Sequence, residues 1–234
     1  MKKLLIDCGN TRIKWGLREN GIWLARGNSG HGELEGLAST WQGLAPGCAI
    51  GSNVAGIGIG NGIEKILPGL KFEWIRARIS QCGVRNGYEE PEKLGSDRWA
   101  ALIAARKLLP EGGIVIGAGT ALTVDILDDE GYFEGGYILP GLHAIMRSVM
   151  NSTRLEIHGG HFSSMPSNTE DAVYSGAILA LTGAVEKISA MMQEPMCLIH
   201  GGDAALLLPH LEAKVEMKDN LVLEGLAEIS ENVP

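Results

Sequence analysis

The chain contains two similar segments, each running from a short apolar strand through a turn with glycine and threonine into a second strand. The first segment covers residues 4–14 and the second covers residues 114–125. Two such segments about a domain's length apart indicate two related lobes. If the two turns face one another, their backbone N–H groups and hydroxyls would line a cleft that suits phosphate. The pattern therefore favours an enzyme that handles nucleotides.

Composition narrows the class of protein further. Of the 234 residues, 45% are hydrophobic and 21% are charged, which is typical of a soluble globular protein. The net charge of −8 argues against nucleic-acid binding, although backbone amides and a few basic side chains can still hold an anion. No apolar run is long enough to cross a bilayer, and Asp7 interrupts the first apolar run too early for a signal peptide. We expect a cytoplasmic protein with no nucleic-acid or membrane partner.

Hydrophobic periodicity predicts alternating strands and helices. In the first half we expect strands at 4–6, 13–18, 22–25, 48–50 and 72–75, helices at 33–44 and 62–67, and a hairpin turn at Asn20-Gly21. In the second half we expect helices at 96–109, 142–150, 169–192 and 221–229, and strands at 114–116, 122–127, 132–139, 196–200 and 215–217. This order predicts an α/β fold with mixed sheets. We expect an N-terminal lobe at 1–105 and a C-terminal lobe at 106–234.

Asp7 ends a predicted buried strand just before a glycine turn. An aspartate there can simply cap the turn through its own backbone. However, Asn10, Thr11, Arg12 and Lys14 follow within seven residues and offer phosphate donors beside a carboxylate that could hold hydrated Mg²⁺. We therefore interpret this segment as an ATP site with Asp7 as the magnesium residue, composed of Asp7, Cys8, Gly9, Asn10, Thr11, Arg12, Ile13 and Lys14.

Together these features resemble the sugar kinase–Hsp70–actin superfamily, in which two ribonuclease-H-like lobes clamp ATP in a cleft. Within it the chain is most similar to the type III pantothenate kinase family. The resemblance runs the whole length of the chain and rests on four motifs in the family's order, at residues 7–11, 95–100, 119–125 and 135–141. It implies ATP-dependent phosphorylation of pantothenate to 4'-phosphopantothenate, the first step of coenzyme A biosynthesis.

The motif Gly95-Ser96-Asp97-Arg98 is the most specific of the four. A structural interpretation is a helix N-terminus, with Ser96 as the cap and Asp97 near the positive end of the helix dipole. The resemblance implies that Asp97 is the base that accepts the proton of the substrate hydroxyl. It also implies that Gly95, Ser96 and Arg98 bind substrate, with the Arg98 fork matching a carboxylate.

Two further residues match substrate contacts of the family. Tyr88 does so in some members, although plain packing explains it almost equally well. Thr169 corresponds to a substrate contact at a helix start, where it could instead, or in addition, belong to a helix cap.

In the second lobe, Thr120 corresponds to a family residue that contacts ATP phosphate, and Gly201-Gly202-Asp203 to a glycine turn on the adenosine side. One departure concerns Gly117, because family members usually carry an aspartate there that binds an activating monovalent cation, K⁺ or NH₄⁺. Either Asp125 compensates, or cation dependence is weakened, or catalysis is altered. Asp125 could equally be an exposed strand end.

The resemblance also implies a homodimer whose pantothenate pocket is completed by the second subunit. We expect Asp7 and Asp97 to come from opposite halves of the molecule and to flank the triphosphate. Two alternatives stay open: a non-catalytic regulatory relative of the same fold, which the loss of an aspartate at Gly117 would suit, and a kinase for another small hydroxy compound.

Overall fold

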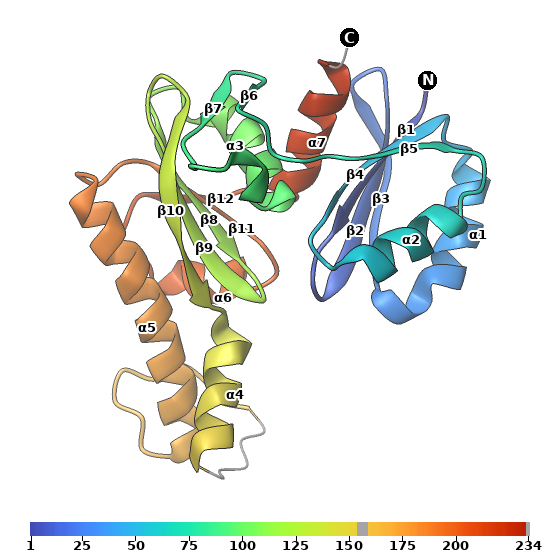
Figure 1. Cartoon of the computed structure of the whole chain (residues 1–234). Helices are drawn as coiled ribbons and strands as arrows, with labels where there is room; N and C mark the ends of the chain where they lie inside the picture. Colours follow the sequence, from blue (N-terminus) through green and yellow to red (C-terminus); the bar gives the residue numbers. More distant parts are fainter. Residues whose placement is uncertain (154–158, 233–234) are drawn as a thin grey trace. The chain divides into compact units, whose positions relative to one another are not determined.

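The computed structural model describes residues 1–153 and 159–232, which form two compact units (Figure 1). Unit 1 contains Met1–Leu108, Gly131–Phe133 and the segment that begins at Asn220. Unit 2 contains Leu109–Glu130 and Glu134–Asp219. The closing helix and residues 131–133 thus group with the first part of the chain, and the lobe boundary after residue 105 stays a prediction.

Unit 1 is built on a five-stranded mixed sheet with the strand order β3-β2-β1-β4-β5. β1 is antiparallel to β2, and β2 to β3, whereas β1, β4 and β5 are parallel. Asn20 and Gly21 have positive φ, as the predicted hairpin turn requires. The elements are β1 (Lys3–Cys8), β2 (Arg12–Glu19), β3 (Ile22–Gly30), α1 (Leu34–Leu44), β4 (Cys48–Asn53), α2 (Ile57–Lys65), β5 (Lys71–Trp74), β6 (Ser80–Gln81), β7 (Val84–Asn86), α3 (Ser96–Leu108) and α7 (Leu221–Glu231).

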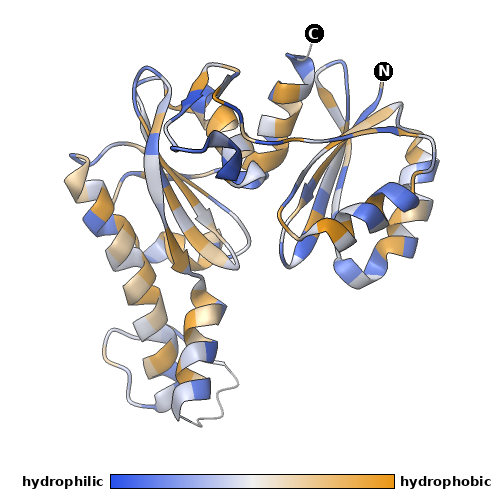
Figure 2. Ribbon diagram, in the orientation of Figure 1, coloured by the Kyte–Doolittle hydropathy of each residue, from blue (hydrophilic) through white to orange (hydrophobic). Residues whose placement is uncertain are grey.

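The sheet of unit 1 is covered by helices on both faces. Leu4 and Ile6 of β1 pack with Trp41 of α1 and Ile63 of α2, all four fully buried. Figure 2 shows the matching hydropathy, with hydrophobic residues concentrated in the strands and alternating with hydrophilic ones along the helices. Alternating side chains of a strand point to opposite faces, so the remaining β1 residues face α7.

The helices α3 and α7 pack together at very close range. A Cβ added at Gly225 would lie 1.8 Å from the carbonyl oxygen of Ala100, so only glycine allows the two backbones to approach this closely. The close approach holds the start of α3, where Asp97 lies, against the core of unit 1.

Unit 2 repeats the topology of unit 1, with the strand order β12-β11-β8-β9-β10. β8 is antiparallel to β9 and parallel to β11, as β1 is to β2 and β4. The fold class, an α/β protein with two mixed sheets, is therefore confirmed. The elements are β8 (Gly113–Ala118), β9 (Ala121–Leu127), β10 (Tyr132–Pro140), α4 (Leu142–Thr153), α5 (Thr169–Met191), β11 (Cys197–His200), α6 (Ala204–Leu207) and β12 (Val215–Met217).

Some details differ from the sequence predictions. α2 begins at Ile57 instead of Gly62, because the Asn53 side chain bonds the Ala55 N–H and the Gly56 carbonyl and directs the chain into a helix there. β6, β7 and α6 were not predicted, since segments of two to four residues carry no readable periodicity. Asp7 and Asp97 both lie in unit 1, so the expectation that they come from opposite halves is wrong. Among the residues described, no helix combines the length and apolar character that a membrane span needs.

Candidate active site

The turn between β1 and β2 presents polar side chains at the end of a buried strand. Asp7 pairs with Lys14 across the ladder, and the turn is closed by the Gly9 N–H, which bonds the Arg12 carbonyl at 3.1 Å. His31 Nε2 lies 2.9 Å from the Gly9 carbonyl oxygen and supports the turn from β3's end. The side chains of the turn, Asn10, Thr11 and Arg12, are exposed. Such a turn combines backbone donors with side-chain donors, as a phosphate site requires.

Not every predicted residue of this segment can act through its side chain. Cys8 and Ile13 are fully buried in the unit 1 core, so only their backbone could contact a nucleotide. Burial, followed by the charge of Asp7, raises the pKa of the Cys8 thiol to about 11, which makes it unreactive. The Arg12 guanidinium donates to Asn28 Oδ1 at 3.0 Å on the exposed side of the turn.

The start of α3 is shaped to hold the Asp97 carboxyl. A Cβ at Gly95 would lie 2.7 Å from Asp97 Oδ1, so the glycine leaves room for that carboxyl group. The Arg98 N–H donates to Asp97 Oδ1 at 2.8 Å. The Ser96 hydroxyl lies 2.8 Å from the buried hydroxyl of Ser52, so it links α3 to β4.

Asp7 and Asp97 both have raised pKa values, and after burial the charge of Asp97 contributes to the shift of Asp7. Burial raises the pKa of Asp7 to about 7, the nearby Asp97 carboxyl adds to this, and Lys14 partly offsets it. Burial also raises the pKa of Asp97, and the hydrogen bond from the Arg98 N–H opposes the change. Ser52, the partner of Ser96, pairs with Asp7 in the β1–β4 ladder, which explains why the two carboxyls lie near each other. Two crowded acids with raised pKa values are typical of functional sites.

This pair of acids fits the way proteins hold Mg²⁺. Mg²⁺ keeps several waters and is bound by one or two carboxylates together with substrate phosphates. No cluster of three or more His, Cys, Asp or Glu side chains able to hold a metal occurs in residues 1–153 and 159–232. The two carboxyls therefore suit a hydrated ion that is also bound by phosphate oxygens of the substrate. They do not suit a metal bound by protein side chains alone.

Tyr88 and Arg98 are brought together beside this pair. Arg98 is a buried cation with 8% of its surface exposed, and its Nη1 donates to the Tyr88 hydroxyl at 2.8 Å. Asn86 Oδ1 accepts from the Tyr88 N–H at 3.0 Å and so fixes the loop that carries the ring. Tyr88 thus makes a polar contact with Arg98, so its role is not limited to the packing that the sequence also allowed.

In unit 2 the predicted residues lie on glycine-rich backbone. Thr120 is exposed in the turn between β8 and β9. A Cβ at Gly141 would lie 2.0 Å from the Gly119 carbonyl oxygen, and one at Gly201 would lie 2.0 Å from that of Ala118. Gly201 also has a φ of +110°, which L side chains rarely adopt. These glycines allow three segments to meet around the Thr120 turn.

The space beside Gly117 is filled by its neighbours. A Cβ at Gly117 would lie 2.6 Å from Thr123 Oγ1 and 3.4 Å from His200 Nε2. Asp125 lies on β9 two residues beyond Thr123, on the same sheet face, and is 1% exposed. Asp125 is therefore buried, and the alternative of an exposed strand end is wrong.

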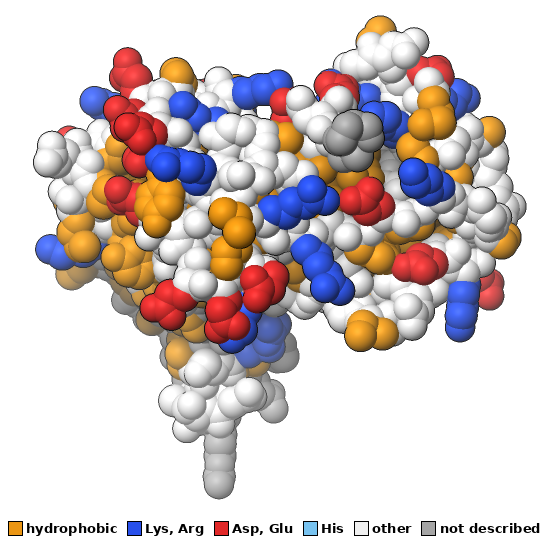
Figure 3. All heavy atoms as spheres, turned by 45° about the horizontal axis from the view of Figure 1, so that its top comes forward, with side chains coloured by type: hydrophobic (Ala, Val, Ile, Leu, Met, Phe, Trp, Pro, Cys, Tyr) orange, Lys and Arg blue, Asp and Glu red, His pale blue; other side chains and the backbone are white. Residues whose placement is uncertain are grey.

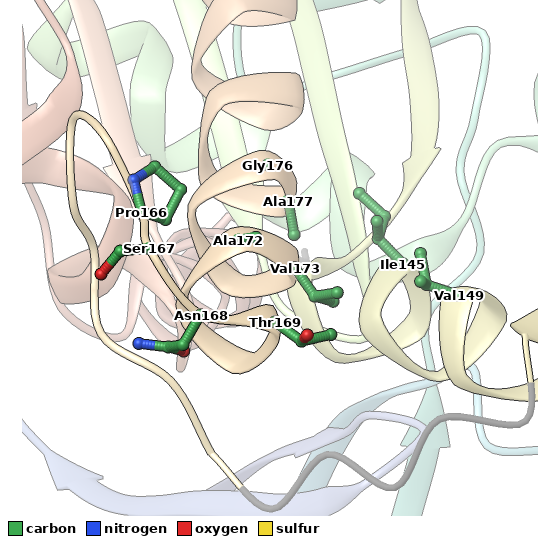
Figure 4. Close-up of a pocket in the computed structure, with 10 residues that line it drawn as sticks. All are labelled: Ile145, Val149, Pro166, Ser167, Asn168, Thr169, Ala172, Val173, Gly176 and Ala177. Carbon is green, nitrogen blue, oxygen red and sulfur yellow. The ribbon is translucent and has the colours of Figure 1, made fainter.

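Thr169 begins α5 and lies at a groove between α4 and α5 with a volume of about 730 Å³ (Figure 4). Asn168 caps this helix, since its side chain accepts from the Asp171 N–H at 2.9 Å. Because Asn168 occupies the capping position, the exposed Thr169 hydroxyl is not the helix cap. The groove is lined by Ile145, Val149, Pro166, Ser167, Asn168, Thr169, Ala172, Val173, Gly176 and Ala177.

Sequence reasoning did not identify several residues that shape the site. Ser52, Asn86 and Phe133 are buried and make contacts that hold Ser96, Tyr88 and Arg98 in place. Only the Asn86-Gly87 pair gave a local signal, because it is typical of a turn. Basic and acidic side chains are interspersed over the face that Figure 3 shows.

Similarity to solved structures shows the fold of the chain. The putative 2-dehydro-3-deoxygalactonokinase of Sinorhizobium meliloti matches with a TM-score of 0.61 at 14% identity, over 98% of both chains. Component A of the (R)-2-hydroxyglutaryl-CoA dehydratase of Acidaminococcus fermentans matches with a TM-score of 0.58 at 11% identity, over 98% of this chain and 96% of that one. The fold is that of the sugar kinases and actin-like ATPases.

The sequence comparisons narrow this class to one family. A family model described as type III pantothenate kinase matches residues 3–191. The type III pantothenate kinase of Nitrosospira multiformis is 44% identical over 97% of this chain and 90% of its own length. The chain belongs to the type III pantothenate kinase family, as its motifs predicted.

Proposed function

We propose that this protein is a cytoplasmic enzyme that transfers the γ-phosphoryl group of ATP to the primary hydroxyl of pantothenate. The product would be 4'-phosphopantothenate, so the reaction would begin coenzyme A biosynthesis. The observation that carries the proposal is the pair Asp7 and Asp97, two neighbouring acids with raised pKa values on the strand and helix that hold the family's motifs. Membership of the type III pantothenate kinase family supports the identity of both substrates.

In this reaction Asp97 is the base. Phosphoryl transfer depends mainly on positioning and charge, and the attacking alcohol must lose its proton. A raised pKa makes the Asp97 carboxylate a better proton acceptor near neutral pH than an ordinary aspartate. The hydrogen bond from the Arg98 N–H to Oδ1 fixes the carboxyl, which leaves Oδ2 to face the hydroxyl.

Asp7 and the two turns hold the nucleotide. Asp7 would bind Mg²⁺ through water, and the bound ion would supply positive charge to stabilise phosphoryl transfer. The segment from Gly9 to Lys14 contributes backbone and side-chain donors to phosphate oxygens, and Thr120 contributes its hydroxyl.

In this proposal pantothenate is held by residues next to the base in unit 1 and by one residue of unit 2. The Arg98 guanidinium pairs with the pantothenate carboxylate, and Tyr88, Gly95, Ser96 and Thr169 complete the contacts. We infer a homodimer in which the second copy completes this pocket. The apolar lining of the groove next to Thr169 supports that inference, since such surfaces commonly mark interaction sites.

A monovalent cation has a smaller part in this proposal. Gly117 supplies no carboxylate, and Thr123 and His200 occupy the space beside it. Hard cations prefer oxygen ligands, and a protein nitrogen such as His200 Nε2 serves them poorly. We infer that turnover depends only weakly on K⁺ or NH₄⁺.

The test is an assay that couples ADP release to a colour change, with pantothenate compared against a panel of small alcohols, sugars and hydroxy acids. Pantothenate should give the highest kcat/KM, and its product should carry phosphate on the primary hydroxyl by mass spectrometry and NMR. ATP binding without turnover on any acceptor would instead favour the regulatory alternative. A higher kcat/KM on another acceptor would favour a different kinase.

A further inference from the structure

Phe133 lies against Arg98 although the rest of α3 and the strands β8 and β9 lie between them in the sequence. The Arg98 guanidinium carbon is 5.7 Å from the centroid of the Phe133 ring and 5.6 Å from that of the Tyr88 ring. The two rings are themselves paired, with centroids 5.5 Å apart and planes inclined by 31°. Phe133 is fully buried, and its segment Gly131–Phe133 groups with unit 1 while the chain on both sides groups with unit 2.

The backbone around the two rings fixes their separation. Phe133 is paired with Asn86 in the parallel β7–β10 ladder. A Cβ at Gly87 would lie 2.1 Å from the Phe133 carbonyl oxygen, so the loop is pressed onto β10 at this point. The Asn86 amide donates to the Pro91 carbonyl at 3.1 Å while its oxygen accepts from the Tyr88 N–H. The ring of Tyr88 is therefore held at a defined distance from that of Phe133.

Such a surround restricts the orientation of the guanidinium group. An aromatic face attracts a cation within about 6 Å of its centroid, and the attraction is stronger where water is excluded, as around buried Arg98. The Tyr88 hydroxyl accepts one N–H of the guanidinium at 2.8 Å. The Arg98 donors lie in one plane, so the hydrogen bond to Tyr88 and the two ring contacts help to set the direction of the whole fork.

We propose that Phe133 is a positioning and specificity residue, which acts with Tyr88 to aim the Arg98 fork at a substrate carboxylate. The proposal rests on the proposed function, because it assumes that Arg98 binds the carboxylate of pantothenate. A fork fixed in advance loses less entropy on binding, so the aromatic pair raises affinity for the acid. It gives no such gain for an analogue in which a hydroxymethyl group replaces the carboxylate. Phe133 therefore makes the enzyme discriminate between pantothenate and the corresponding alcohol.

The experiment is the steady-state kinetics of Phe133→Leu with pantothenate, with pantothenol, which carries a hydroxymethyl group in place of the carboxylate, and with ATP. We expect the KM for pantothenate to rise about tenfold, as loss of one desolvated cation–π contact implies. We expect kcat to stay within about twofold and the KM for ATP to be unchanged, since the ring touches neither reacting atom. The preference for pantothenate over pantothenol should fall by the same factor of about ten.

Two variants serve as controls. Phe72 is also half of an aromatic pair in unit 1, with its ring 4.6 Å from that of Trp74, so Phe72→Leu removes a ring without touching Arg98. Its kinetic constants should equal those of the wild type. Phe133→Tyr retains the ring, and it should restore the KM for pantothenate to near the wild-type value. If Phe133→Leu does not fold, Phe133→Met removes the same ring but fills the buried position with a flexible apolar side chain, and it should give the same selective rise.

Several results would overturn the proposal. An unchanged KM for pantothenate in a folded Phe133→Leu protein would remove the positioning role while leaving the proposed function intact. Parallel changes in kcat and in both KM values, without any loss of preference over pantothenol, would assign Phe133 to general stability. By contrast, a wild-type protein that does not phosphorylate pantothenate would defeat the proposed function itself, and that result is visible before any variant is made.

Discussion

The penultimate residues of β1 and β8 occupy the same place in the two units but have opposite character. In unit 1 Asp7 lies between Lys14 and Ser52 in the sheet. In unit 2 Gly117 lies between Thr123 and His200 in the equivalent register. The same backbone topology thus carries an acid with a raised pKa in unit 1. In unit 2 it carries a glycine, and neighbouring side chains occupy the space beside that glycine. At this register position the two units share their strand pairing, and unit 1 carries an acid where unit 2 carries a glycine.

The contrast extends to the surrounding residues. In unit 1 the second acid, Asp97, has room because Gly95 has no side chain. In unit 2 the crowded glycines Gly141 and Gly201 bring backbone segments together and contribute no charge. We therefore expect unit 1 to be sensitive to changes of charge and unit 2 to be sensitive to changes of backbone shape.

The largest effect should follow removal of the base in unit 1. Asp97→Asn keeps the shape and the hydrogen bond from the Arg98 N–H but cannot accept the substrate proton. Because a positioned base contributes about 10²–10⁴-fold, kcat should fall by that factor, with ATP affinity kept within a few fold. Single-turnover kinetics and nucleotide binding by calorimetry measure the two quantities. Asp219→Asn, at an exposed aspartate, is the control. Retention of kcat in Asp97→Asn would remove Asp97 from the chemistry.

Unit 2 should respond to a single methyl group. Gly201→Ala places a Cβ 2.0 Å from the Ala118 carbonyl oxygen and forces an alanine to a φ of +110°. We expect a loss of about 3 kcal/mol in unfolding free energy, together with weaker ATP binding through the displaced Thr120 turn. The adjacent Gly202→Ala is a matched control, because nothing lies within 4 Å of its Cβ position. Equal denaturation midpoints for the two variants would contradict a role for backbone crowding.

The third expectation concerns the pH dependence of stability in unit 1. The pKa of Asp7 is about 7 in the folded protein, against 3.8 for an aspartate side chain free in water, so folding favours its protonated form. This contribution is fully present below pH 3.8 and is lost as the pH rises through 7. The full shift corresponds to about 4 kcal/mol, which is an upper limit on the difference in stability.

Asp7→Asn removes this loss, so the variant should be more stable than the wild type at pH 8 and should show a flatter curve between pH 4 and 7. Urea unfolding across this pH range, without nucleotide, measures the difference. Asp171→Asn, at an exposed aspartate whose pKa is lowered by the His161 N–H, should lose stability near neutral pH instead. Equal stability of Asp7→Asn and wild type at pH 8 would mean that ionised Asp7 does not destabilise the protein in the absence of nucleotide.

The sequence predicted the repeated strands because alternating apolar residues and glycine turns are local signals. Both sheets and the long helices followed from such patterns, within a few residues at their ends. Asp7, Asp97 and Arg98 were identified by motif, and the structure brings them into one unit. Their raised pKa values could not be predicted, since those values depend on burial by distant segments.

The contact of Phe133 with Arg98 also could not be predicted from the sequence. It depends on the parallel pairing of β7 with β10, and β7 has only three residues, too few for a periodic signal. The start of α2 was missed for a related reason, because glycines at 58, 60 and 62 give little indication of a helix that Asn53 initiates through its side chain. Local propensity failed where a side chain or a distant strand sets the geometry.

The smallest expected effect is that of monovalent cations on turnover, and it tests the Gly117 position itself. Turnover in K⁺ and NH₄⁺ should differ less than about twofold from turnover in choline or tetramethylammonium, because Gly117 lacks the carboxylate that would hold a hard cation. Gly117→Asp alone would clash with Thr123 Oγ1, so the informative variant is Gly117→Asp combined with Thr123→Ala. This pair should gain stimulation by K⁺ and a rise in melting temperature with K⁺, and Thr123→Ala alone should gain neither. A wild-type enzyme stimulated tenfold by K⁺ would contradict the comparison between units. It would mean that Asp125, on the same face two residues beyond Thr123, supplies the anionic anchor and that unit 2 carries charged chemistry as well.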